Sequence, residues 1–178
     1  MLVQLAILAF SYSNVVCKSA PMGTFKSLSL TDCEVHGPAL DMTTYLHNIN
    51  QNGDKALDLN LDLPYDLDAT QIMFNLDVAR WDGGTWKERV YNVQGEFYEY
   101  MDKYIPQLWA RFRQQITPKV EHEYIFSKNM YTLRNFESQI EDLEFPSALY
   151  GKFKLSLQLY NSDDENILCK VYEVDSTQ

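Results

Sequence analysis

The sequence predicts a mainly β protein, a two-sheet antiparallel sandwich or cup of about seven to eight strands with one inserted kinked helical segment at about residues 96–116. Three observations predict this class. Several segments alternate apolar and polar residues, the turns between segments are rich in Gly, Asn and Asp, and one segment changes to a helical period. The chain has 178 residues, of which 46% are hydrophobic, so it can bury one sizeable core.

Three segments place apolar side chains on one face and polar side chains on the other, which is the pattern of antiparallel strands. The apolar sets are Leu57, Leu59, Leu61 and Leu63; Ile72, Phe74, Leu76 and Val78; and Phe153, Leu155, Leu157 and Leu159. Further strands are expected at residues 25–33, 86–93, 131–136 and 167–174, and hairpin turns at residues 52–54, 82–84 and 162–166.

The helical segment carries an apolar stripe. Its members recur at spacings of four, four, three and four, and they are Phe97, Met101, Ile105, Leu108 and Phe112. Because Pro106 lies inside the stripe, we expect either a kink or a second short helix that begins at Pro106.

The first 17 residues contain no charged side chain and hold a short apolar run followed by small and polar residues. This pattern is typical of a signal peptide, and we expect cleavage after Cys17 and secretion of residues 18–178 as a single extracellular domain. The alternative is a buried N-terminal strand or helix. No apolar run reaches the ~18–20 residues of a transmembrane segment.

Cleavage after Cys17 would leave two cysteines, Cys33 and Cys169. An even count in an oxidising compartment favours a disulfide between them, although two buried free thiols are the alternative. The chain-entropy model assigns the closure of such a long loop at most ~5 kcal/mol. No Cys-x-x-Cys pair is present, which disfavours a zinc or thioredoxin-like site.

The charge excludes one large class of partners. The chain has 15 basic and 25 acidic residues, a formal net charge of −10. Nucleic-acid binding needs a cationic surface, so we expect no nucleic-acid partner. The same acidity disfavours docking onto anionic membranes.

No catalytic or metal-binding motif is visible. The three histidines, His36, His47 and His122, form no metal-ligand pair, and no nucleophile elbow or phosphate-binding glycine loop occurs. The carboxylates at residues 141–144 and 163–165 are explained by solvated turns. We therefore expect no enzyme, no metal and no cofactor.

A sandwich covered by a kinked helix can leave an apolar cavity between its sheets, and an elongated apolar ligand would be held there by buried area, at ~25 cal/mol per Å². Its walls would be Leu59, Leu61, Phe74, Leu76, Phe153, Leu155 and Leu157, and its cover would be the helical stripe. The alternative is that these residues form a tightly packed core.

Two tryptophans, Trp81 and Trp86, flank the hairpin tip at residues 82–85. Exposed indoles suit an interface or the mouth of a pocket, where we expect them, but cross-strand packing on the hairpin explains them equally well.

The C-terminal half carries a family resemblance. The matching segments are residues 124–133 (YIFSKNMYTL), 142–146 (DLEFP), 151–155 (GKFKL) and 166–171 (NILCKV), joined in the N-terminal half by Phe25, Cys33 and residues 95–106. Their order and spacing resemble the ganglioside-activator branch of the ML lipid-recognition superfamily, and within it the insect secreted chemosensory proteins of the CheB type.

The resemblance implies a β-cup that holds lipid acyl chains or similar apolar molecules, and a disulfide between Cys33 and Cys169. Two further family cysteines correspond here to Tyr98 and Tyr124. The helical cover would therefore lack a covalent tie to the sheet, and we expect it to be more mobile.

We therefore expect a secreted, non-enzymatic binding protein for a lipid, fatty acid or long-chain hydrocarbon. The chemosensory branch implies pheromone detection and a sensory receptor as partner. The activator branch implies a protein that presents a glycolipid to a hydrolase, and this is the first alternative. A secreted structural protein with a filled core is the second.

Overall fold

The computed structural model describes residues 24–36, 39–137 and 150–177. Over these residues it confirms the mainly β, antiparallel, two-sheet architecture that the sequence predicts. The expected signal peptide and Cys17 lie outside the described residues.

The larger sheet has five strands. Their order is β1 (Thr24–Asp32), β10 (Asn166–Thr177), β9 (Gly151–Tyr160), β5 (Met73–Trp81) and β6 (Trp86–Glu96). Every neighbouring pair is antiparallel. Strand β9 is therefore the middle strand, with hydrogen-bonded partners on both sides.

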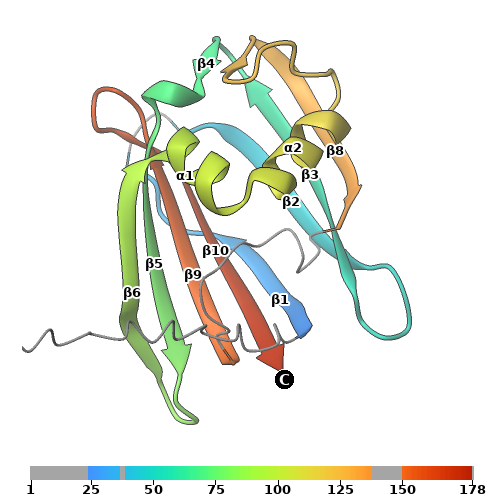
Figure 1. Ribbon diagram of the computed structural model, residues 1–178, viewed down its shortest axis with the longest axis vertical. Helices are drawn as coiled ribbons and strands as arrows, with labels where there is room; N and C mark the ends of the chain where they lie inside the picture. The colour runs from blue at the N-terminus through green and yellow to red at the C-terminus, as the bar shows by residue number, and fades with distance from the viewer. Residues whose placement is uncertain (1–23, 37–38, 138–149, 178) are drawn as a thin grey trace, which may run out of the picture.

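The smaller sheet has three strands in the order β2 (Asp41–Asn48), β3 (Lys55–Leu63) and β8 (Asn129–Phe136). A short pair, β4 (Leu67–Asp68) with β7 (Ile125–Phe126), and a 3-10 turn, η1 (Ala69–Gln71), lie at the helix end of the molecule (Figure 1).

All seven strands predicted from alternation or composition are present, and the three predicted turns connect β2 to β3, β5 to β6 and β9 to β10. Strand β2 was not predicted. Its inward positions include Thr44 between Met42 and Leu46, and its outward positions include the exposed Tyr45, so its apolar alternation is weak.

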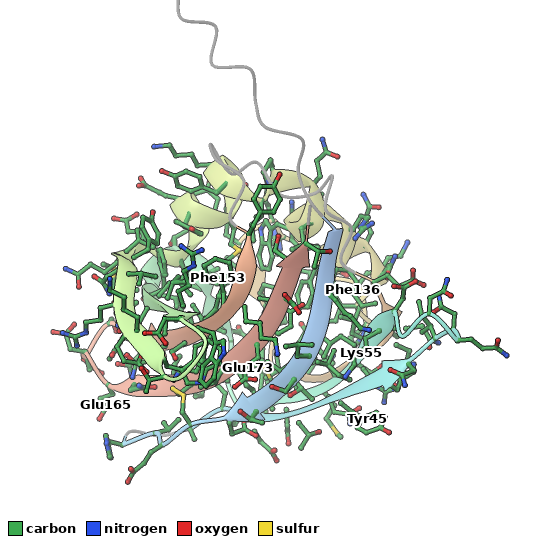
Figure 2. The ribbon with its side chains drawn as sticks, turned by 90° about the horizontal axis from the view of Figure 1, so that it is seen from below. Tyr45, Lys55, Phe136, Phe153, Glu165 and Glu173 are labelled. Atoms are coloured by element: carbon green, nitrogen blue, oxygen red, sulfur yellow. A yellow bond between two sulfur atoms is a disulfide. The ribbon has the colours of Figure 1, made fainter. Side chains whose placement is uncertain are left out.

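The two sheets meet along one side and diverge along the other, as the view from below shows (Figure 2). On the closed side β1 lies beside β2. On the open side, helix α1 (Phe97–Tyr104) contacts β6 and η1, and helix α2 (Pro106–Gln115) contacts β8. The helices thus bridge the diverging edges over the upper part of the molecule (Figure 1).

The helical segment consists of two helices, and Pro106 is the first residue of the second, as expected. Proline is well tolerated there because its missing N–H would have no partner in the first turn of a helix. Ile105, at φ −141° and ψ 45°, forms the non-helical junction.

Two adjacent residues of β10 fasten the closed side of the cup. Cys169 forms the expected disulfide with Cys33, which follows β1, at a Cα–Cα distance of 5.2 Å. Lys170 points the other way, is 6% exposed, and forms an ion pair with Asp32 of β1. Its Nζ also donates to the Met42 carbonyl at 3.2 Å and to Thr44 Oγ1 at 3.3 Å, both in β2.

We predict that Lys170→Met lowers the free energy of unfolding by ~2 kcal/mol, because the substitution removes charge-assisted hydrogen bonds between the two sheets and keeps the apolar stem. Urea unfolding measures the change. The matched control is Lys154→Met, which breaks the ion pair with the exposed Glu88 at 2.9 Å and should cost less than ~1 kcal/mol. Equal losses in the two variants would contradict a joining role for Lys170.

Candidate functional site

The apolar face of the five-stranded sheet points toward the three-stranded sheet, as alternation predicts. Its cross-strand pairs are Phe74 with Leu159, Leu76 with Leu157, and Val78 with Leu155. These pairs run along the middle of the sheet and form one wall of the space between the sheets.

Beneath the helices this space is filled by aromatic rings. The Trp109 ring lies 5.7 Å from Phe97 edge-on and 5.5 Å from Phe112 in a stacked arrangement, measured between centroids. Phe126 lies 5.9 Å from Trp109, and Phe136 lies 6.1 Å from Phe112. This half of the interior is a packed core.

Several predicted wall and cover residues belong to this packed core. Leu59, Leu61 and Phe74 are 5%, 6% and 3% exposed, and the partly buried residues that pack against them include Phe97, Met101, Leu108 and Phe112.

Ile105 is not among the residues of the packed core. Beyond the junction at Pro106 the stripe residues Leu108 and Phe112 still pack against this core, and Trp109 is the buried residue of α2 at 7% exposure. Four of the five stripe residues therefore pack against the core, and the stripe did not include Trp109.

A second, smaller apolar cluster lies on the same face of the larger sheet. Val78, Phe153 and Val174 are buried in it, and Leu155 and Tyr172 pack against it while only partly buried. The interior is therefore divided into two dry clusters. Leu76 is the partly buried residue that packs against both.

Leu76, Leu155 and Leu157, which we name the central leucine face, separate the two clusters. Leu155 and Leu157 belong to the middle strand, the position that a filled sandwich covers best, yet all three side chains are only partly buried. The diverging sheets thus leave an accessible apolar surface over the centre of the larger sheet.

Three tyrosines border this surface. Tyr91 of β6 pairs in register with Val78 and is 51% exposed. Tyr100 of α1 packs its ring 4.6 Å from Phe74 and 4.6 Å from Tyr104. Burial, together with the neighbouring Tyr91 and Tyr104, raises the pKa of Tyr100 to about 12. Tyr100 therefore stays protonated at neutral pH and keeps a hydroxyl donor beside the apolar face.

Two hollows of the described surface lie outside the space between the sheets. One, of about 350 Å³, lies on the outer face of the larger sheet, and the other, of about 240 Å³, lies beside the disulfide at the crossover from β1 to β2.

The two tryptophans lie on the opposite side of the sheet. Their rings meet edge-on at 5.4 Å, and the Lys154 ammonium lies 5.1 Å from the Trp86 centroid. Lys154 alternates with the inward Phe153 and Leu155, so it faces outward. Trp81 and Trp86 therefore pack as a cross-strand pair and do not flank the central leucine face, which corrects their expected place at its mouth.

Helix α1 is tied to the segment before β7 by a pair of phenols. The Tyr98 hydroxyl donates to the Tyr124 hydroxyl at 2.9 Å, and the ring centroids are 4.0 Å apart. Hydrogen bonding between the two phenols, together with burial, raises the pKa of Tyr124. A non-covalent contact thus joins the two positions at which the resembling family has cysteines.

Within the described ranges, neither helix has the length and apolar character of a membrane span. Across the same residues, no three His, Cys, Asp or Glu side chains gather as a metal site requires.

Comparison with known proteins assigns no family to this chain. No family model and no curated protein matches the chain. Among solved structures, the chain is similar to chicken MD-1 complexed with lipid IVa, with 9% sequence identity and a TM-score of 0.42 over 88% of this chain and 99% of that chain.

Alkaline pH should destabilise the protein through its tyrosines. An unfolded tyrosine has a pKa of about 10, whereas the pKa of Tyr100 is raised to about 12. Between these values the unfolded state loses its proton first, so the contribution of Tyr100 to stability is complete below about pH 10 and is lost as pH rises towards 12.

Urea unfolding between about pH 9 and pH 11.5 measures this loss. Tyr100→Phe should flatten the pH dependence, and the exposed Tyr45→Phe should leave it unchanged. An unaltered slope in Tyr100→Phe would show that this hydroxyl does not contribute.

The phenol pair predicts the mobility of the helical cover. Amides of residues 97–115 should exchange with solvent faster than those of β9 and β10, because no covalent bond holds the cover. Tyr98→Phe should cost ~1 kcal/mol and speed exchange in α1 further. Tyr104→Phe, in the same helix, is the control. Equal protection of the helices and the central strands in the unmodified protein would refute the prediction.

Proposed function

We propose that this protein binds the apolar chain of a lipid, fatty acid or long-chain hydrocarbon against the central leucine face. The observation that supports this most directly is the partial exposure of Leu155 and Leu157 on the middle strand. Covering these apolar side chains removes their surface from water, which is favourable. An elongated apolar ligand has the shape to cover them.

The energies are sufficient for binding without any catalytic group. A chain that removes roughly 400 Å² of combined apolar area from water gains ~10 kcal/mol. An association cost of about 4 kcal/mol leaves ~6 kcal/mol, or a Kd of some tens of micromolar. The dry clusters on either side of the leucines lower the cost further, because their side chains are already ordered.

The tyrosine border suits the polar end of such a ligand. Tyr91, Tyr100 and Tyr104 come from β6 and α1, at the edge where the sheets diverge. Phenol hydroxyls donate and accept hydrogen bonds, and their rings pack against apolar chains. In this proposal the chain lies on the leucines and a polar end group lies among the phenols.

The finer role in this proposal is that of a secreted, non-enzymatic carrier in chemosensory detection, as the sequence resemblance implies. The disulfide between Cys33 and Cys169 fits an oxidising compartment, and the net charge of −10 disfavours adsorption to anionic membranes. A glycolipid-presenting activator would use the same apolar face. Stimulation of a hydrolase on membrane-bound but not on soluble substrate would favour the activator role.

Native mass spectrometry of protein expressed in a lipid-containing host, followed by titration with the fluorescent fatty acid cis-parinaric acid, tests the proposal. Leu155→Gln should weaken binding about tenfold, equivalent to ~1.4 kcal/mol, because a polar amide replaces apolar contact area. The matched control is Ser156→Gln, the adjacent residue on the opposite face of β9, which should bind as the unmodified protein does.

Circular dichroism checks that each variant is folded. If Leu155→Gln does not fold, Leu157→Gln provides the same test from the neighbouring inward position. A clean apo mass with no uptake of cis-parinaric acid, or equal weakening by Ser156→Gln, would overturn the proposal in favour of a structural protein with a filled core.

A further inference from the structure

The outer face of the five-stranded sheet carries a second feature, independent of the apolar face. Its hollow of about 350 Å³ extends from the disulfide and Val171 on one side to polar side chains of β9, β5 and β6 on the other.

A row of hydrogen bonds fixes the polar side chains across this face. Asn92 Nδ2 donates to Asn75 Oδ1 and to Asp77 Oδ1, both at 2.8 Å. Asn75 Nδ2 donates to Asp77 Oδ2 and to Gln158 Oε1, both at 3.2 Å. Tyr160 adds a hydroxyl donor to Gln158 Oε1 at 3.0 Å. The Gln158 carboxamide is therefore held in one orientation by its oxygen.

The row leaves hydrogen-bonding groups unused at the hollow. Gln158 Nε2 and the Ser156 hydroxyl have no hydrogen-bond partner among the described residues, and both residues line the hollow. Arg89 lines it too, with φ +52°, a conformation that residues other than glycine rarely adopt. Its Nε lies 3.7 Å from Asp77 Oδ1, and most of its side chain is exposed. The oriented amide of Gln158, together with the rotatable hydroxyl of Ser156 and the exposed guanidinium of Arg89, thus faces an open volume.

The composition of the lining selects a class of ligand. Asp77 is already engaged with Arg89, and Glu88 pairs with Lys154 at 2.9 Å, so these carboxylates attract a further cation weakly. An anion would be repelled by the carboxylates of Glu34, Asp77 and Glu88. It would be attracted by only one arginine of the lining. A neutral ligand rich in hydroxyl groups avoids both problems, and the apolar strip of Val171 and the disulfide matches the C–H face of a sugar ring.

We propose that this hollow binds a neutral saccharide. Gln158 and Ser156 supply hydrogen bonds to its hydroxyl groups, Arg89 closes one side, and Val171 packs against its apolar face. The hollow and the central leucine face lie on opposite sides of the same sheet, so the two ligands bind independently. A free saccharide, a glycoprotein glycan and a glycolipid headgroup share the chemistry required.

A printed array of neutral and acidic oligosaccharides tests the proposal, followed by calorimetric titration with the soluble form of the best neutral binder. We expect neutral but not acidic saccharides to bind, and Gln158→Ala to weaken binding at least tenfold. The control is Asn60→Ala, an amide on the outer face of the three-stranded sheet that donates to Thr43 Oγ1 at 3.2 Å. This variant should bind the saccharide as the unmodified protein does.

Competition distinguishes the sources. The free saccharide, a glycoprotein bearing it, and phosphatidylcholine vesicles containing the matching glycosylceramide are compared at equal sugar concentration, and the strongest competitor identifies the source. No binding of any neutral saccharide, preference for acidic saccharides, or no effect of Gln158→Ala and Ser156→Ala would overturn the proposal. The cis-parinaric acid titration measures a different ligand at a different site. The saccharide-binding proposal can therefore fail while the lipid-binding proposal stands, and the reverse.

Discussion

On its closed side the cup is held by two neighbouring residues of β10 that point in opposite directions, and only Lys170 of the two reaches the smaller sheet. Cys169 links the outer surface to the start of the crossover, and Lys170 reaches through the inner surface to the backbone and a hydroxyl of β2. A sandwich held in this way is free to diverge at its other side. The divergence is what leaves Leu155 and Leu157 partly uncovered on the middle strand, where a symmetric sandwich would bury them.

The helices compensate for the divergence over only part of its length. Their aromatic residues fill the upper half, with Trp109 at the centre, and the Tyr98–Tyr124 contact holds α1 against the segment before β7. A covalent link at this place would make the cover a fixed part of the sandwich. Because a hydrogen bond between two phenols holds it instead, the cover can separate from the sandwich at a cost of only ~1 kcal/mol. This suits a surface that has to admit a ligand.

The alternating segments were predictable because burial of one sheet face imposes a period of two, as β3, β5 and β9 show. Trp81 was misplaced although the signal was present, since counting in twos from Phe74 puts it on the outward side. Trp109 was missed because Leu108, one position before it, already continued the apolar spacing. The exposure of Leu155 could not be predicted, because it depends on how far two sheets diverge and not on any local pattern.

Strand β9 has an apolar face made of leucines and a polar face that includes Ser156 and Gln158. Because side chains alternate strictly, a slip of one position against β5 or β10 would exchange the two sides completely. An insertion or deletion within this strand would therefore erase both surfaces in one event, whereas a point substitution affects only one. The two ligand preferences proposed for this protein thus depend on one property, the register of strand β9.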